Sequence, residues 1–195
     1  MSEKKSILVF CGSQTGKNPI YAAEAARLGK MIAEKGANMI YGGGSVGLMG
    51  ISARAALDNG AAVTGIIPWF LQKSEGGLQN LTEEITVGSM HERKIRMAEM
   101  SDGVFVLPGA YGTLDELFEM LTLQQLKQIN QPVAVYNLNG FYDHLLRHVD
   151  KMNEEGFLQH SNKEIIRSSD DMAALLDYIL EYPAHEGINK PLTWL

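Results

Sequence analysis

Residues 88–119, GSMHERKIRMAEMSDGVFVLPGAYGTLDELFE, decide the fold that we expect for this chain. Residues 103–107 are a short apolar run bounded by turn-forming residues, which is typical of a strand buried in a parallel sheet. Residues 108–112 interrupt the strand, and Thr113 is expected to open a helix. The apolar residues of that helix follow the spacing of one helical face: Leu114, Leu117, Phe118 and Leu121.

The glycine-containing loop 108–112 leads directly into the start of this helix. The first amide groups of a helix have no partner within it, and the helix dipole adds partial positive charge at the same place. Glycine allows a ligand to approach the backbone closely. We therefore expect an anion site here, most naturally for a phosphate group.

Two cations lie at the start of a preceding helix. Ser89 and Glu92 have the spacing of a capping box, so that helix is expected to begin near Met90. Arg93 and Lys94 then lie about one turn from its positive end, where cations are mildly disfavoured. An anionic ligand would hold them there; the alternative is that they belong to a solvated helix face.

Glu116 also has two interpretations. Thr113 and Glu116 repeat the capping-box spacing, so the carboxylate would only satisfy the backbone N–H of Thr113. The alternative is that Glu116 lies beside the anion site and takes part in catalysis. Spacing alone puts the capping interpretation slightly ahead.

Length and composition restrict the kinds of protein that this chain can be. Its 195 residues, 45% of them hydrophobic, suit a single domain with a sizeable core. The net charge of −6 argues against nonspecific binding of nucleic acid or membranes, so an anionic ligand needs a local positive pocket. His144 and His148 are four residues apart, but no carboxylate or cysteine joins them in a metal-binding signature, and no metal site is expected.

The compartment is expected to be the cytoplasm. The N-terminal residues lack a signal-peptide pattern, and no apolar run approaches the ~20 residues of a membrane-spanning helix. The one cysteine, Cys11, excludes an internal disulfide and fits a reducing environment. Cys11 follows an apolar strand, so it is expected to be a packed small residue rather than a nucleophile.

Strands and helices are expected to alternate along the chain. The expected strands are residues 6–11, 38–41, 62–67, 84–87, 103–107, 132–136 and 165–166. The expected helices are residues 19–35, 48–59, from 90 onward, 113–128, 141–154 and from a cap at Asp170 or Asp171 to 182. This alternation predicts an α/β fold: a single-domain, Rossmann-like, mainly parallel sheet with helices on both faces. Residues 1–182 form that domain, and residues 183–195 are a tail that could dock on the body or on a neighbouring subunit.

A second glycine loop follows the second expected strand. Residues 42–47 formally match the dinucleotide fingerprint, but no acidic residue ends the next strand, and no Lys-Ser/Thr pair makes a phosphate-binding P-loop. Close contact with a ligand, by Gly43, Gly44 and Ser45, is expected; a plain strand-to-helix turn is the alternative. Loops 12–16, 42–47 and 108–112 would meet at the carboxyl ends of the strands, and together they predict a small phosphorylated ligand such as a mononucleotide.

The chain resembles the LOG (Lonely Guy) family of cytokinin riboside 5′-monophosphate phosphoribohydrolases over residues 6–180. The motifs that carry the resemblance are FCGS at 10–13, YGGGSVGLMG at 41–50, MHERK at 90–94 and PGAYGTLDE at 108–116. The family was often labelled "possible lysine decarboxylase", but no lysine here stands out as an anchor for pyridoxal phosphate, and no cofactor is expected.

The resemblance implies hydrolysis of the bond between a base and ribose 5-phosphate in a nucleoside 5′-monophosphate, either a cytokinin nucleotide or AMP. Arg93 and Glu116 would be the catalytic pair, and the enzyme would be a homodimer. The implied substrate contacts, besides this pair, are Glu75, Lys94, Gly109, Ala110, Tyr111, Gly112, Thr113, Leu114, Asp115 and Thr122. In this scheme Glu116 stabilises positive charge on the ribose and activates water, while Arg93 orients Glu116 and the substrate.

Ala110 departs from the family pattern, which usually has glycine there. If the position needs a positive φ, alanine costs ~1 kcal/mol or more. We expect instead that it needs only a small side chain, because Gly109 and Gly112 remain for the turns. Two other functions compete with the hydrolase: a non-catalytic nucleotide-binding or sensor protein, and a weaker third, a dinucleotide-dependent oxidoreductase.

Overall fold

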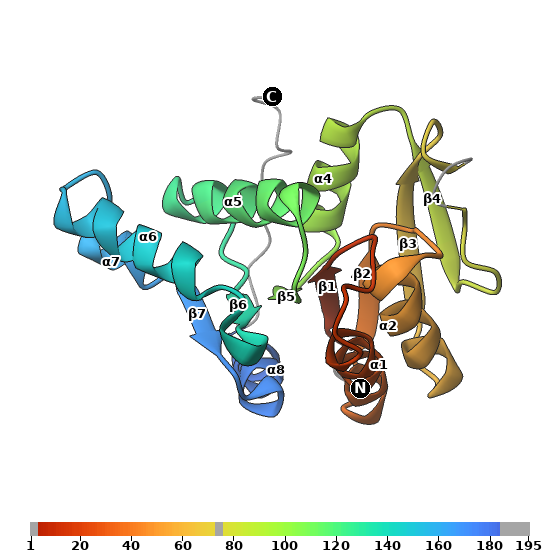
Figure 1. Ribbon diagram of the computed structural model, residues 1–195. Helices are drawn as coiled ribbons and strands as arrows, with labels where there is room; N and C mark the ends of the chain where they lie inside the picture. The colour runs from red at the N-terminus through yellow and green to blue at the C-terminus, as the bar shows by residue number, and fades with distance from the viewer. Residues whose placement is uncertain (1–3, 73–75, 184–195) are drawn as a thin grey trace.

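The computed structural model describes residues 4–72 and 76–183, and one parallel sheet organises them (Figure 1). Its strands are β1 (Ser6–Phe10), β2 (Asn38–Tyr41), β3 (Val63–Pro68), β4 (Glu83–Val87), β5 (Gly103–Val106), β6 (Val133–Tyr136) and β7 (Ile166–Ser169). They lie in the order β4-β3-β2-β1-β5-β6-β7, and every neighbouring pair is parallel. The predicted α/β class is therefore confirmed.

Helices cover both faces of the sheet, as the alternation predicted. The helices are α1 (Ile20–Glu34), α2 (Gly47–Asp58), α4 (Met90–Glu99), α5 (Tyr111–Gln125), α6 (Asp143–Glu154), α7 (His160–Lys163) and α8 (Met172–Glu181), with a 3-10 turn η1 (Leu138–Gly140). In Figure 1, α4 and α5 lie over one face, whereas α1, α2 and α8 lie below the other.

Strand β1 shows why both faces need cover. Ile7 and Val9 belong to the core cluster that includes α1, α2 and α8, whereas Leu8 and Phe10 belong to the cluster that includes α4 and α5. Successive side chains of a strand point to opposite faces, so a strand that is apolar throughout is buried on both sides.

The chain reverses its direction across the sheet at β1. It first builds β2, β3 and β4 on one side, then returns to place β5, β6 and β7 on the other. Such a point leaves a crevice at the carboxyl ends of the strands, because the loops there diverge. The Gly12 amide donates to the Pro108 carbonyl at 3.1 Å, which joins the loops after β1 and β5 at this crevice.

Side-chain caps set the ends of several helices. The Asn18 carboxamide oxygen accepts from the Ile20 amide, and the Ser89 hydroxyl accepts from the Glu92 amide at 3.0 Å. The Glu92 carboxylate bonds the Gly88 amide at 2.7 Å rather than the amide of Ser89, so the capping box reaches one residue further back. Of the two aspartates considered, Asp171 is the cap of α8, and it accepts from Ala173 and Ala174.

The prediction that Thr113 opens α5 is wrong. The helix begins at Tyr111, with Ala110 in the N-cap position and no side-chain cap. Thr113 is buried in the first turn, where its side chain packs on Gly109; a Cβ there would lie 2.0 Å from the Thr113 Oγ1. Glu116 is therefore in the second turn, and Thr113 and Glu116 do not form a capping box at the start of α5.

Other differences concern element ends. Helix α5 stops at Gln125 rather than Gln128, because Lys127 has a left-handed φ of 56°. Strand β3 includes Pro68, and β7 extends to Ser169. Helix α7 was not predicted, since four residues are too few to show a helical period.

Parts of the sequence prediction are not tested by this structure. Apart from Pro183, the expected tail 183–195 lies outside the described residues, so the division into a domain and a tail stays a prediction. Within the described residues, no helix combines the length and the apolar character needed to span a bilayer.

The cap of α8 gives a direct test of the fold. Asp171→Ala should lower the free energy of unfolding by about 1 kcal/mol, because the first amides of the helix lose their acceptor. The matched control is the neighbouring Asp170→Ala, which should change stability by less than about 0.5 kcal/mol. Urea unfolding of both variants measures the difference, and equal losses would contradict the assignment of the cap.

Candidate active site

Arg93 is held by backbone carbonyls at the carboxyl ends of two strands. Its side chain leaves the first turn of α4 and is only 6% exposed, which rules out the solvated-face interpretation for this residue. Nε donates to the Ile66 carbonyl at 3.0 Å, and Nη2 donates to the Gly42 carbonyl at 2.7 Å. Buried charges persist when such bonds compensate their lost hydration, so this guanidinium is fixed in one orientation.

Gly42 makes room for the guanidinium. A Cβ on this residue would lie 1.9 Å from Arg93 Nη2, so any side chain would displace the arginine. Gly42 is thus needed for close contact as predicted, but the contact is with Arg93 of the same chain and not with a ligand.

Glu116 faces Arg93 from α5. The distance from Arg93 Nη1 to Glu116 Oε1 is 4.0 Å, and the carboxylate side chain is only 12% exposed. At this distance, and largely shielded from water, the two side chains attract each other as an ion pair. The structure therefore brings the predicted pair together.

The pair lines a cavity of about 170 Å³, called here the Arg93 cavity, at the carboxyl end of β1. The described residues that line it are Cys11, Gly12, Ser13, Met49, Leu71, Met90, Arg93, Ala110, Gly112, Thr113 and Glu116. The predicted site residues in this cavity are Arg93, Ala110, Gly112, Thr113 and Glu116.

The start of α5 supplies backbone amides to the same cavity. Gly112 and Thr113 are the second and third residues of the helix, and no side chain caps its N-terminus. Amides at this position have no carbonyl partner within the helix. Helices α4 and α8 are capped by side chains, so the bare start of α5 is the better place for an anion.

The alanine at position 110 causes no backbone strain. Its φ is −111°, so the position does not need a left-handed conformation, as we expected. The reason given for that expectation was wrong, because Gly109 and Gly112 do not have positive φ values either. Gly109 is needed for contact with Thr113, and Gly112 lies within α5 with open space around it.

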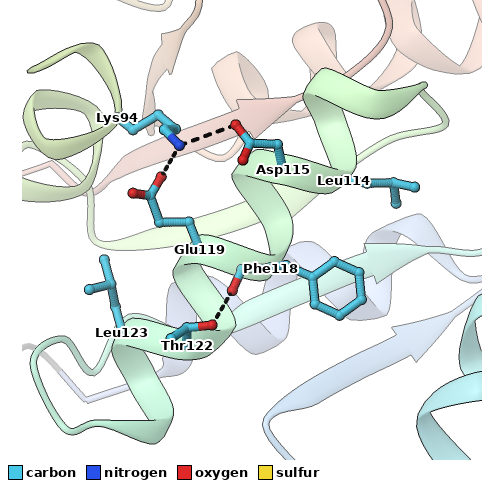
Figure 2. Close-up of a pocket in the computed structure, with 7 residues that line it drawn as sticks. All are labelled: Lys94, Leu114, Asp115, Phe118, Glu119, Thr122 and Leu123. Atoms are coloured by element: carbon cyan, nitrogen blue, oxygen red, sulfur yellow. Dashed lines mark hydrogen bonds and ion pairs between the residues drawn. The ribbon is translucent and has the colours of Figure 1, made fainter. Parts of the chain in front are cut away.

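Lys94 lies in a different place from Arg93, in a groove between α4 and α5 that Figure 2 shows. Its Nζ lies 3.1 Å from Asp115 and 2.8 Å from Glu119. Burial lowers the pKa of Lys94, but the hydrogen bonds to Glu119 and Asp115 outweigh it, so the pKa is raised overall. The Lys94 groove is also lined by Leu114, Phe118, Thr122 and Leu123.

The other predicted contacts that the structure describes do not line the Arg93 cavity. Thr122 bonds the Phe118 carbonyl at 2.7 Å in the Lys94 groove, and Tyr111 is 91% exposed. Gly43, Gly44 and Ser45 are not among the described lining residues; Gly44 forms a bridge with Gly77, and the Ser45 amide donates to Gly76. Glu75 lies outside the described residues.

Cys11 lines the cavity without the properties of a nucleophile. Burial raises the pKa of its thiol, and the neighbouring Glu116 carboxylate raises it further. The reactive form of cysteine is the thiolate, which these surroundings disfavour. Within the described residues, no group of three or more His, Cys, Asp and Glu side chains could hold a metal ion.

Sequence reasoning did not assign Met49, Leu71 and Met90 to the site, although all three line the Arg93 cavity. Apolar residues give no chemical signal, and only the tertiary structure brings them to the carboxyl ends of the strands. The run of three glycines at 42–44 did indicate a close contact at Gly42, but we interpreted it as a contact with a ligand.

Comparison with known proteins identifies the family. The family model described as "Possible lysine decarboxylase" matches residues 49–179. The cytokinin riboside 5′-monophosphate phosphoribohydrolase LOG2 of Arabidopsis thaliana is 41% identical over 199 residues, which cover 100% of this chain and 93% of that protein. The chain belongs to the LOG family. A second member, LOG3 of Arabidopsis thaliana, is 41% identical, and the alignment covers 99% of this chain and 90% of LOG3.

Solved structures share the fold of this LOG-family chain. The molybdenum cofactor binding protein of Rippkaea orientalis aligns with a TM-score of 0.69 at 23% identity, covering 92% of this chain and 98% of that one. The molybdenum cofactor carrier protein of Chlamydomonas reinhardtii aligns with a TM-score of 0.65 at 18% identity, covering 91% and 99%. At this identity the likeness shows the Rossmann-like fold alone.

The hydrogen bonds from Arg93 to the Ile66 and Gly42 carbonyls should stabilise the fold. Arg93→Met should lower the free energy of unfolding by about 1–3 kcal/mol, because two buried carbonyls lose their donor. Arg96 is a matched control on α4, with a half-exposed side chain paired to Glu99, and Arg96→Met should cost less than about 0.5 kcal/mol. Urea unfolding measures both, and an Arg93→Met protein as stable as the parent would contradict the account.

The surroundings of Cys11 predict low reactivity. At pH 8 the native thiol should react with iodoacetamide at least about 100-fold more slowly than in urea, because little thiolate is present in the fold. Cys11 is the only cysteine, so the unfolded protein is its own control. Equal rates in the native and unfolded protein would show that the thiol is accessible and ionised.

Proposed function

We propose that this chain hydrolyses the N-glycosidic bond of a nucleoside 5′-monophosphate and releases the free base and ribose 5-phosphate. Membership of the LOG family supports this reaction, and so do the names of the relatives. The observation that carries the proposal is the Arg93–Glu116 pair, 4.0 Å apart beside an uncapped helix start.

The 5′-phosphate is proposed to bind the first amides of α5. Gly112 and Thr113 line the Arg93 cavity, and the helix dipole favours an anion there. This arrangement provides positive potential locally in a chain of net charge −6. The ribose then extends toward Glu116.

The reaction proceeds by loss of the base from C1′ of the ribose. The C1′–N bond breaks, its electron pair leaves with the base, and positive charge builds on the sugar as in other glycoside hydrolyses. The Glu116 carboxylate stabilises this charge and takes a proton from the water that attacks C1′. The departing base gains a proton, so ribose 5-phosphate and free base are the balanced products.

Arg93 is proposed to orient this carboxylate rather than to exchange protons. Its Nε and Nη2 are bonded to Ile66 and Gly42, which fixes the guanidinium plane while Nη1 faces Glu116. Fixed donors cost no reorganisation during the reaction, which is the basis of electrostatic preorganisation.

The finer assignments are part of the same proposal. AMP and an N6-prenylated AMP are the proposed substrates, no cofactor is needed for this hydrolysis, and the protein acts in the cytoplasm. We propose that the chain forms a homodimer and that Lys94 and Thr122, which lie in the groove of Figure 2, act next to the partner subunit. Glu75 is proposed to contact the substrate.

The competing functions have less support. A non-catalytic nucleotide binder was favoured mainly by the alanine at position 110, but Ala110 has a negative φ, so its backbone is not strained and this argument loses its force. A dinucleotide-dependent oxidoreductase would use loop 42–47 to hold phosphates, but the Ser45 amide is bonded to Gly76.

The proposal predicts that Glu116→Gln abolishes turnover without abolishing binding. Release of adenine from AMP should fall by at least about 100-fold, because a general base of this kind contributes that much or more. The dissociation constant for AMP should change by less than about threefold, since the phosphate contacts remain. Chromatography of the products and calorimetry measure the two quantities.

Glu99→Gln, on the exposed side of α4, is the control and should leave both quantities unchanged. Full turnover by Glu116→Gln would remove Glu116 from the mechanism. Binding of AMP by the parent chain without any adenine release, at high protein concentration, would instead support the non-catalytic alternative.

A further inference from the structure

A second hollow, distinct from the Arg93 cavity, opens at the carboxyl ends of β1 and β5. It has a volume of about 200 Å³, several times the ~30 Å³ that one water molecule occupies. Its described lining consists of loop 12–16, loop 108–110, Tyr21, Leu48 and Phe141. We call it the Tyr21 hollow.

The Tyr21 hollow has aromatic walls and no charged lining side chain within the described residues. The rings of Tyr21 and Phe141 meet edge to face, with centroids 5.9 Å apart at 77°. Tyr21 also packs on Gly16, where a Cβ would lie 2.7 Å from the Tyr21 ring. Such walls suit a flat aromatic ring and offer a phosphate group no partner cation.

The Tyr21 hollow adjoins the Arg93 cavity. Gly12, Ser13 and Ala110 line both. Ala110 is the N-cap residue of α5, so the start of the helix lies at the border, and Gly112 and Thr113 follow it on the side of the Arg93 cavity. Arg93 and Glu116 line only the Arg93 cavity, and Tyr21 and Phe141 line only the hollow.

The positions of these residues determine which part of a bound nucleotide can enter the Tyr21 hollow. If the 5′-phosphate binds the α5 amides, the sugar and the scissile bond lie on the Glu116 side. The Tyr21 hollow then lies on the opposite side of the phosphate. A group in the hollow must therefore be joined to the substrate through that phosphate.

We propose that the Tyr21 hollow is a second subsite that takes an aromatic ring linked to the 5′-phosphate, as in a dinucleoside pyrophosphate. The inference rests on the proposed function only for the position of the phosphate. The bond that breaks is unchanged, so the enzyme would release one base from such a dinucleotide by the same addition of water.

The test compares three ligands by calorimetry: AMP, N6-isopentenyl-AMP and diadenosine pyrophosphate. Diadenosine pyrophosphate should bind about tenfold more tightly than AMP, the gain expected from stacking one base on an aromatic wall. Phe141→Ala should remove this gain and leave the dissociation constant of AMP unchanged. Phe141→Leu, which keeps an apolar wall, should lose part of it and serves if the alanine variant folds poorly.

Phe157→Ala is the matched control, because Phe157 is 89% exposed and lies outside the lining of the hollow. Diadenosine pyrophosphate binding no more tightly than AMP would overturn the inference, and so would an equal effect of Phe141→Ala on AMP. A selective loss of N6-isopentenyl-AMP binding would also overturn it, since the hollow would then take the substituent of the base.

Measuring adenine release from AMP in parallel separates the two proposals. Adenine release without binding of diadenosine pyrophosphate would overturn only the subsite. Binding of the dinucleotide that depends on Phe141, without release of adenine from AMP, would support the subsite and overturn the hydrolase.

Discussion

The hydrogen bonds from the Arg93 guanidinium to the carbonyls of Gly42 and Ile66 connect the sheet to the catalytic pair. They join the ends of β2 and β3 to α4, and they aim the remaining nitrogen at Glu116 on α5. The arrangement depends on local chemistry at both ends, because Ser89 sets the start of α4 and Gly42 leaves space for the guanidinium. A buried cation that is fixed in this way can hold a carboxylate in a reactive position without moving itself.

The charged groups on the two sides of the start of α5, in the Lys94 groove and in the Arg93 cavity, have different partners. Lys94 is paired with Asp115 and Glu119 on the outer side of the helix, so its charge is neutralised there. In the Arg93 cavity the charge of Arg93 is balanced by Glu116, so the uncapped amides at the start of α5 remain as a source of positive potential among the described residues. An acidic protein can thus bind a phosphorylated sugar, because the favourable potential is confined to one cavity and is little screened there.

More of the fold than of the candidate site could be predicted from the sequence. Apolar runs such as Gly103–Val106 and caps such as Asp171 are local signals, and they predicted the order of the strands and of the longer described helices, but not the four-residue α7. The start of α5 was missed because Thr113, a good capping residue by type, is used for packing on Gly109. The Arg93–Glu116 approach could be predicted only through the family resemblance, and the apolar lining residue Met49 gave no chemical signal at all.

The most direct test of the account is a crystal structure of the protein with ribose 5-phosphate, one of the proposed products. The account predicts phosphate oxygens within hydrogen-bond distance of the Gly112 and Thr113 amides, and C1′ within about 3.5 Å of the Glu116 carboxylate. A ribose 5-phosphate bound elsewhere, or one whose C1′ faces away from Glu116, would contradict it.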